Sequence, residues 1–342
     1  MLFSSLIARR FGASITSMYY LAIDSGTTQS RIWLMNDLQI LKRISVPVGV
    51  RNSAIDGHNR ALFEGLASAI TEIRNSATHS QLPQFAVAAG MITSNLGICE
   101  VKHASTPVGI EGLSSGITVR SFPEFGQIPF YFIPGVRSGP TQADFNNADE
   151  IDIMRGEETE VMGYLSDSGK PRPLLYVHLG SHTKLIRIDD CRRIAGSLST
   201  LAGEMYAAIH KGTILHDSLP VDPDFEIKEE SLLPGWISCR KYGLNRSLYL
   251  VRILHLHSGY SKEFLNSFLL GAILSEDFRC LDSLRARYSI KEVVLSGLPH
   301  LQPGWSFFLK FFDISYRMLT AEETEGLFLK GAFRILSLRL GF

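Results

Sequence analysis

The chain contains 342 residues, of which 45% are hydrophobic and 20% are charged, so it can bury one large core or two smaller ones. Two domains are the expectation at this length. Lys plus Arg and Asp plus Glu both number 34, so there is no net field to attract nucleic acid or an anionic membrane, and neither is expected as a partner. The four cysteines lie far apart without a CxxC pair, which argues against a zinc site or a disulfide framework and favours a cytoplasmic location.

Residues 1–18 carry two arginines, several hydroxyl side chains and no acid, a composition that resembles a targeting leader. Met18, however, directly precedes the first expected strand. A short disordered extension or a start codon assigned too early is the simpler interpretation, and a cleaved leader is the alternative. Residues 264–274 come nearest to a membrane span, but Asn266 and Ser267 interrupt the apolar run and favour a buried helix.

Residues 19–35 have the pattern of a strand, a tight glycine turn that carries hydroxyls, and a returning strand. Gly26 lets the backbone approach a ligand without a Cβ clash, and donors of Gly26, Thr27 and Thr28 can then face phosphate oxygens. Asp24 ends the first strand, where it would face a divalent metal through water, because a hard cation prefers oxygen ligands. Taken alone, the pattern also fits an ordinary β-hairpin.

Alternating strands and helices follow this hairpin. The patterns predict a third strand at 40–46, a helix at 59–74, and short buried strands at 85–91 and 130–135. Ligand groups gather at the carboxyl ends of strands in a parallel or mixed sheet. The loop after Met91, with Thr93, Ser94 and Asn95, is therefore a candidate for binding sugar hydroxyls, and a solvated polar turn is the alternative.

Residues 153–163 gather acids in what we expect to be the first turn of a helix. Acids at a helix N-terminus complement the helix dipole, so the segment needs no function to explain it. Its position is the reason to consider one, because the chain would cross between two lobes here, just before a second glycine turn.

That second turn repeats the first hairpin. Residues 174–188 again place a glycine, a hydroxyl and a cation between two apolar strands, at Gly180, Ser181 and Lys184. Each hairpin alone is weak evidence. The pair, spaced about one lobe apart, predicts a nucleotide held between two lobes.

Several of these stretches together resemble the 2-dehydro-3-deoxygalactonokinase family, in the superfamily of actin, hexokinase, sugar kinases and exopolyphosphatases. The Met-Arg-Gly-Glu-Glu-Thr block is the most specific of them. The matching residues are Ala22 to Thr28 with Arg31 and Trp33, Ala89-Gly90-Met91 followed by Ser94, Asn95 and Gly97, Ile133-Pro134-Gly135, Met154 to Thr159, and Gly180 to Lys184.

The resemblance implies an α/β fold of two ribonuclease H-like lobes with an actin-like ATPase cleft between them. It implies ATP-dependent phosphorylation of the 6-hydroxyl of 2-dehydro-3-deoxy-D-galactonate, a sugar acid of galactonate catabolism, with Mg²⁺. We place the first lobe at 19–158 and the second at 159–342, with the last helix free to return to the first lobe. A homodimer is an open expectation.

Carried over residue by residue, the resemblance assigns roles within this sequence. Glu157 or Glu158 would be the base that takes the hydroxyl proton, by analogy with a Glu-Glu pair of exopolyphosphatases, and Arg155 or Lys184 would offset charge on the phosphates or the substrate carboxylate. The cofactor set is Asp24 (also the metal ligand), Gly26, Thr27, Thr28, Arg31, Gly180, Ser181, His182, Lys184 and Gly297. The substrate set is Gly90, Met91, Ser94 and Asn95.

The sequence departs from the family pattern in places. Ser25 stands where relatives commonly have Trp, and Leu185 where they have an aromatic residue. Residues 293–299, which include Gly297, replace a glycine and hydroxyl loop of the adenine site, and residues 322–326 replace a glycine-aspartate sequence. Glu204 matches a Gly-Glu-Leu segment and would contact nucleotide or metal, or simply start a helix. An exopolyphosphatase-like phosphohydrolase and a non-catalytic nucleotide sensor stay open as alternatives to the kinase.

Overall fold

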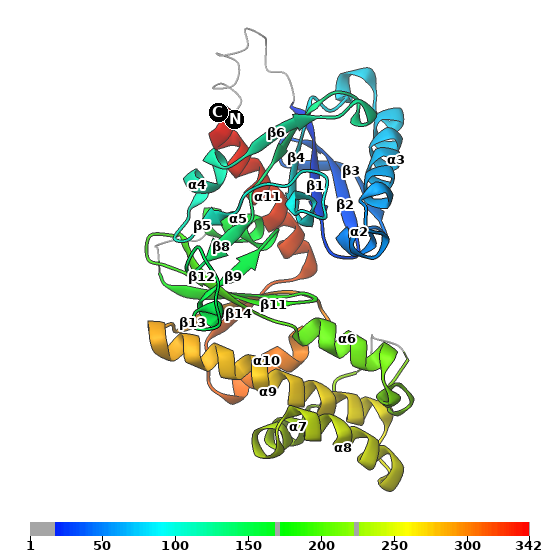
Figure 1. The fold of residues 1–342 in the computed structure, drawn as a ribbon, viewed down its shortest axis with the longest axis vertical. Helices are drawn as coiled ribbons and strands as arrows, with labels where there is room; N and C mark the ends of the chain where they lie inside the picture. Colours follow the sequence, from blue (N-terminus) through cyan, green and yellow to red (C-terminus); the bar gives the residue numbers. More distant parts are fainter. Residues whose placement is uncertain (1–17, 168–171, 222–225, 342) are drawn as a thin grey trace. The chain divides into compact units, whose positions relative to one another are not determined.

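The computed structural model describes residues 18–167, 172–221 and 226–341, which fall into two compact units (Figure 1). Unit 1 takes the residues before 172 together with 192–196 and 325–342, and unit 2 takes 172–191 and 197–324. The predicted N-terminal extension lies outside the described residues except for Met18, which is buried.

Unit 1 is built on a six-stranded mixed sheet in the order β3-β2-β1-β4-β7-β6. β1 pairs antiparallel with β2 and parallel with β4, and β4 pairs parallel with β7. β4 is buried at every position, as a central strand covered on both faces should be. The strands are β1 (Tyr19–Ser25), β2 (Ser30–Asn36), β3 (Gln39–Val46), β4 (Phe85–Gly90), β6 (Thr118–Ser121) and β7 (Pro129–Phe132), and a small sheet adds β5 (Ala104–Ser105), β8 (Val136–Ser138) and β9 (Asp152–Met154).

Helices cover the two faces of the large sheet in unit 1. The apolar stripe of α3 packs into the core between that helix and the strands, as its spacing predicts. On the other face, Trp33 and Tyr20 of the sheet contact Phe328 and Phe333 of α11. The helices of this unit are α2 (Val50–Asp56), α3 (Arg60–Ser76), α4 (Ile110–Ser115), α5 (Glu157–Asp167) and α11 (Ala321–Leu340), which joins it at Glu325.

Helices α5 and α11 cross very closely. A Cβ at Gly163 would lie 1.9 Å from the carbonyl oxygen of Leu327, and one at Gly331 would lie 1.8 Å from that of Thr159. This glycine-to-backbone packing holds α5 in unit 1, so unit 2 begins at Arg172, later than the boundary at 158 expected from the sequence. The last helix belongs to unit 1 from Glu325 onward.

Unit 2 repeats the plan of unit 1 with a five-stranded sheet in the order β12-β11-β10-β13-β14. β10 pairs antiparallel with β11 and parallel with β13, which pairs parallel with β14. Its core lies between this sheet and a layer of helices. The elements are β10 (Leu174–Leu179), β11 (Thr183–Ile188), β12 (Ile194–Thr200, which belongs to this unit from residue 197), β13 (Glu292–Gly297), β14 (Tyr316–Met318), α6 (Ala202–Gly212), α7 (Glu229–Tyr242), α8 (Leu244–His257), α9 (Lys262–Tyr288) and α10 (Gln302–Phe311).

Each unit therefore has an antiparallel hairpin, β1–β2 or β10–β11, and parallel strands on the far side of β1 or β10, which is the ribonuclease H-like order. In unit 1, β3 extends the antiparallel side and β6 pairs antiparallel with β7 at the other edge. The predicted α/β fold class is confirmed. Residues 264–274 form the buried first part of α9, as expected. Across the described ranges, every helix is too short or too polar to span a bilayer.

Candidate active site

The first glycine turn joins β1 to β2 and is fixed by its own neighbours. The backbone N–H of Gly26 donates to the carbonyl of Gln29 at 2.8 Å, and the hydroxyls of Ser25 and Ser30 hydrogen-bond at 2.8 Å. Ser25, which departs from the family pattern, thus serves to close the base of the hairpin. Thr28 is exposed at the tip. The three predicted turn residues share one preformed turn at the carboxyl end of β1.

Asp24 lies beside this turn in a space lined by glycines. Its Oδ2 pairs with Arg31 Nη2 at 2.5 Å across the hairpin. Gly90 ends the neighbouring strand β4 with φ +89°, and a Cβ there would lie 2.5 Å from the Ser25 carbonyl oxygen and 3.1 Å from Asp24 Oδ1. A Cβ at Gly156 would lie 3.9 Å from the same Oδ1. Side chains at Gly90 or Gly156 would therefore fill the space around the Asp24 carboxylate.

Burial raises the pKa of Asp24, and the nearby Arg31 guanidinium opposes that shift. The carboxylates of Glu160 and Glu157 raise the pKa of Asp24 further. Two acids of α5 thus act electrostatically on the Asp24 carboxyl of β1. A cation at Asp24 would relieve this repulsion and would favour the ionised carboxylate.

The acidic block opens helix α5, and its two glutamates have different surroundings. Glu158 is fully buried, and both of its carboxylate oxygens accept the backbone N–H of Gly156, at 2.9 and 2.8 Å. Desolvation, reinforced by Glu157, raises the pKa of Glu158 to about 8. Glu157 is only partly buried and accepts one backbone N–H, from Arg155 to Oε2, at 3.1 Å.

Arg155 ties the acidic block to the loop after β4. Its Nη1 donates to Thr93 Oγ1 at 2.7 Å, and its Nη2 donates to the carbonyl of Val101 at 2.9 Å. Burial lowers the pKa of Arg155, while Glu158 acts in the opposite direction. His103 lies against the same guanidinium, and burial together with the two arginines Arg155 and Arg137 lowers the pKa of His103 to about 4.

The predicted substrate loop, residues 90–95, contains a short 3₁₀ turn at Met91–Thr93. The hydroxyl of Ser94 is buried and donates to the Met91 carbonyl at 2.7 Å, so it stabilises the loop itself. The Asn95 side chain is exposed. The structure thus brings Gly90, Thr93 and Arg155 together around Asp24 and α5, and it leaves Asn95 as the open polar group of this loop.

In unit 2, the second glycine turn joins β10 to β11 and lies against the start of α6. The backbone N–H of Glu204 donates to the Ser181 carbonyl at 2.6 Å, and the His182 ring pairs with the Glu204 carboxylate at 3.1 Å. A Cβ at Gly203 would lie 2.1 Å from the Gly180 carbonyl oxygen, so α6 can start here only with a glycine. Glu204 is therefore a helix-start carboxylate in contact with the turn.

Gly297 and Lys184 flank the same turn. Gly297 ends β13 beside Leu179, which directly precedes Gly180, and its φ of +96° is one that glycine adopts readily. Lys184 is 7% exposed, and its Nζ donates to Ser199 Oγ at 2.7 Å. The structure therefore places all five predicted cofactor residues of this unit at one end of its sheet.

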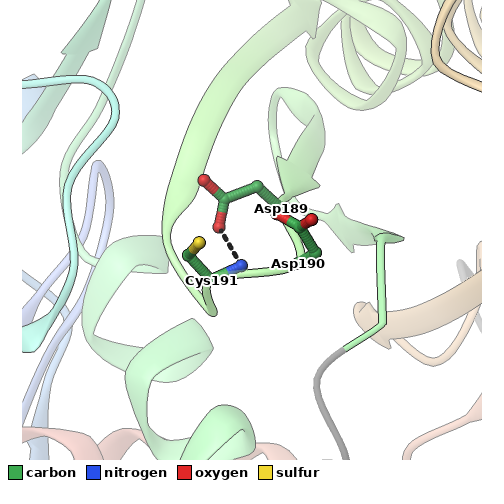
Figure 2. Close-up of side chains that lie close together, drawn as sticks. All are labelled: Asp189, Asp190 and Cys191. Carbon is green, nitrogen blue, oxygen red and sulfur yellow. Dashed lines mark hydrogen bonds between the residues drawn. The ribbon is translucent and has the colours of Figure 1, made fainter.

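A further group of metal-type ligands lies at the turn after β11. One ligand atom from each of Asp189, Asp190 and Cys191 lies within 4.8 Å of the others (Figure 2). The backbone N–H of Cys191 donates to Asp189 Oδ1 at 3.0 Å, which is the hydrogen bond of an Asx turn. Since Asp190 and Cys191 are exposed and this bond explains the geometry, we assign the group no role.

The sequence profile of the 2-keto-3-deoxy-galactonokinase family matches residues 24–335, a range that includes both glycine turns and the acidic start of α5. The chain belongs to this family. The predicted family and the predicted enzyme class, a phosphotransferase, are thereby confirmed, and the phosphohydrolase and sensor alternatives are not favoured.

Curated relatives of this kinase family carry matching names. The chain is 25% identical over 263 residues to the 2-dehydro-3-deoxygalactonokinase of Escherichia coli K12, a match that spans 75% of this chain and 78% of that protein. It is 27% identical over 201 residues to a candidate 2-dehydro-3-deoxygalactonokinase of Rhizobium meliloti 1021, and this match spans 58% of this chain and 59% of that protein.

Solved structures support the fold. A candidate 2-dehydro-3-deoxygalactonokinase from Sinorhizobium meliloti superposes with a TM-score of 0.71 at 22% identity and covers 92% of this chain and 98% of its own. Component A of the (R)-2-hydroxyglutaryl-CoA dehydratase of Acidaminococcus fermentans superposes with a TM-score of 0.50 at 13% identity, covering 95% and 100%. At these identities the likeness establishes the fold alone.

One acid at the site, Glu160, was not singled out in the sequence. Glu160 is 5% exposed and acts on the pKa of Asp24, but in the sequence it is one more acid in a helix-start run. Thr93, which the sequence placed in the candidate sugar-hydroxyl loop, hydrogen-bonds the Gly90 carbonyl at 2.9 Å and Arg155. For Glu160, the i, i+3 spacing from Glu157 was an available signal, because it places both acids on one helix face.

Proposed function

We propose that this protein transfers the γ-phosphoryl group of ATP to the 6-hydroxyl of 2-dehydro-3-deoxygalactonate. The single observation that carries the proposal is the family match over residues 24–335, since it spans every residue to which we assign a role. The relatives named for this activity, from Escherichia coli and Rhizobium meliloti, support the choice of substrate.

Asp24 is our proposed residue for the magnesium ion of the nucleotide, through water. The residues fit such an ion, because glycines at 90 and 156 leave the space around Oδ1 free of side chains and because further acids raise the pKa of Asp24. When bound, ATP would supply the phosphoryl group, and Mg²⁺ would neutralise the charge that develops on it. Arg31 would then be left to orient Asp24 through its ion pair.

Glu157 is our choice for the base. Glu158 is unsuited because it is fully buried and both of its oxygens accept the N–H of Gly156. Glu157 is partly exposed, keeps one oxygen without a described backbone bond, and lies near enough to Asp24 to raise its pKa. In the proposed step, Glu157 accepts the hydroxyl proton as the substrate oxygen bonds to phosphorus, and ADP leaves with the electrons of the broken P–O bond.

The remaining site residues take supporting roles in the proposal. Donors of the two glycine turns, residues 26–28 and 180–182, would each bind phosphate oxygens, and Lys184 would offset their charge. Gly297 would let the backbone approach the nucleotide. Gly90, Met91, Ser94 and Asn95 would form the sugar-acid loop, with Asn95 as the side chain that contacts a hydroxyl. A cytoplasmic location and a homodimer stay predictions.

A coupled ADP-release assay tests the proposal with a panel of 2-keto-3-deoxy sugar acids. We expect rapid ADP release with ATP, Mg²⁺ and the galactonate-derived acid, and little release without a sugar acid. A stereoisomeric gluconate-derived acid in the panel tests substrate choice, because a single stereocentre separates the two. Equal ADP release with and without every acid would contradict the kinase and favour a hydrolase, and ATP binding without any turnover would favour a sensor.

A further inference from the structure

A buried carboxylate in unit 2 lies behind the second glycine turn and has no part in the roles above. Asp277 is on α9 and is 1% exposed. Its Oδ1 accepts the Thr200 hydroxyl at 2.6 Å, whereas its Oδ2 is buried without a hydrogen-bond partner among the described residues. Burial raises the pKa of Asp277 to about 6, and the hydroxyls of Thr200 and Thr183 lower it in part. A buried acid of this kind is costly, and an apolar residue would usually serve packing better.

The two threonines that face Asp277 lie on both sides of the glycine turn. Thr183 is the first residue of β11 and directly follows the turn residue His182. Thr200 is the last residue of β12 and lies two residues before α6. The Thr183 hydroxyl affects the Asp277 pKa although it is buried without a hydrogen bond of ordinary geometry among the described residues.

The turn and α6 are in direct contact on the other side of these threonines. The Ser181 carbonyl accepts the backbone N–H of Glu204 at 2.6 Å, and Gly203 leaves no room for a side chain against Gly180. The position of the turn therefore depends on where β11 begins and where α6 begins. Asp277 accepts the hydroxyl of Thr200, which lies two residues before the first residue of α6.

We propose that Asp277 is a positioning residue for the second phosphate turn, which it holds through its hydrogen bond with Thr200. The inference rests on the proposed function, because it takes the turn at residues 180–182 as a binding site for ATP phosphates. Asp277 itself touches no substrate in this proposal. Its task is to keep the backbone donors of the turn in one place before the nucleotide arrives, so that binding does not have to order them.

The test compares four variants of the full-length protein. Asp277→Ala removes the carboxylate, Asp277→Asn keeps an acceptor for Thr200, and Thr200→Val removes the donor at constant shape. Asp282→Asn is the matched control, because Asp282 lies on the same helix and is exposed. Amide hydrogen exchange of segments 178–184 and 200–206 is measured without ligand, and KM for ATP and kcat are measured separately.

We expect Asp277→Ala to speed exchange in both segments and to raise KM for ATP, each by about tenfold, with a much smaller change in kcat. Asp277→Asn should restore part of both effects, and Asp282→Asn should change neither. If Asp277→Ala does not fold, Thr200→Val carries the test. Unchanged exchange in Thr200→Val would overturn the positioning role, and faster exchange with an unchanged KM for ATP would overturn its link to phosphate binding.

This outcome is separable from failure of the proposed function. If the unmodified protein phosphorylates no sugar acid, the kinase proposal fails on its own assay. The exchange measurement needs no turnover, so it still decides whether Asp277 fixes the turn.

Discussion

The backbone N–H of Gly156 donates to both carboxylate oxygens of Glu158, so this glutamate is bonded to the turn that precedes its own helix. The neighbouring Glu157 accepts a single backbone N–H and is partly exposed. One member of the pair therefore fixes the backbone, and the other keeps an oxygen available to a substrate. Their different surroundings lead to different consequences of the same substitution.

Glu157→Gln should lower kcat by about 10²- to 10⁴-fold, because it removes the proposed base while keeping size and shape. ATP affinity, measured by calorimetry, should change little, since base removal acts on the chemical step. Glu64→Gln is the matched control, an exposed glutamate on α3. Full activity in Glu157→Gln would contradict the assignment.

Glu158→Gln should change how stability depends on pH. Because the pKa of Glu158 is raised to about 8 in the folded state, against 4.5 for the free group, the folded protein holds an extra proton between these values. Its contribution to the free energy of unfolding is thus largest at low pH and is lost as pH rises toward 8, by at most about 1.4 kcal/mol per pH unit.

Denaturant unfolding of the unmodified protein and of Glu158→Gln between pH 5 and pH 8.5 checks this sign. The other buried acids with raised pKa, Asp24 and Asp277, contribute equally to both proteins. The difference between the two curves therefore isolates Glu158. A difference that stays constant across this range, or that grows in favour of the unmodified protein as pH rises, would show that the carboxyl is ionised throughout.

Gly90→Ala should cost far more than the same change at Gly57. Both glycines have positive φ, +89° and +73°, so both substitutions strain the backbone. Gly57 is in the αL region, where a side chain costs about 1–2 kcal/mol, whereas Gly90, with ψ −157°, is in a region that essentially only glycine adopts. Only at Gly90 would the new Cβ meet backbone, 2.5 Å from the Ser25 carbonyl oxygen, whereas nothing lies within 4 Å at Gly57. Scanning calorimetry should show a much larger loss of Tm for Gly90→Ala, together with loss of activity, because the new atom would also crowd Asp24. Equal losses in the two variants would show that the space beside Asp24 is not restricted.

Local sequence patterns predicted the parts of the site that are formed by consecutive residues. The glycine turns at 26 and 180, the strand that ends at Gly90 and the acidic start of α5 were all predicted, because turn and strand signals act over a few residues. The same rules could not show that the Ser94 hydroxyl closes its own loop and is withdrawn from ligands. That depends on how the chain turns back after Met91.

Local sequence patterns could not predict contacts between residues that are far apart in the chain. Arg155 reaches Thr93 across 62 positions, and Thr200 reaches Asp277 across 77, so no spacing in the sequence connects them. The late start of unit 2 has the same origin. Helix α5 belongs to unit 1 because Gly163 and Gly331 let it cross α11, which arrives from the far end of the chain.

Arg155→Met should raise KM for the sugar acid by about tenfold and leave KM for ATP nearly unchanged, because the guanidinium fork ties the substrate loop to α5. Hydrogen exchange in residues 91–103 should quicken in parallel, and the exposed Arg60→Met serves as control. Arg155→Lys discriminates between the two roles open to this residue. A lysine offers one ammonium in place of a fork, so it cannot donate to Thr93 and Val101 with the same geometry, but it keeps the positive charge. If Arg155 acts as a tether, Arg155→Lys should resemble Arg155→Met. If instead lysine restores activity and Arg155→Met alters KM for ATP, the reaction uses the positive charge of Arg155.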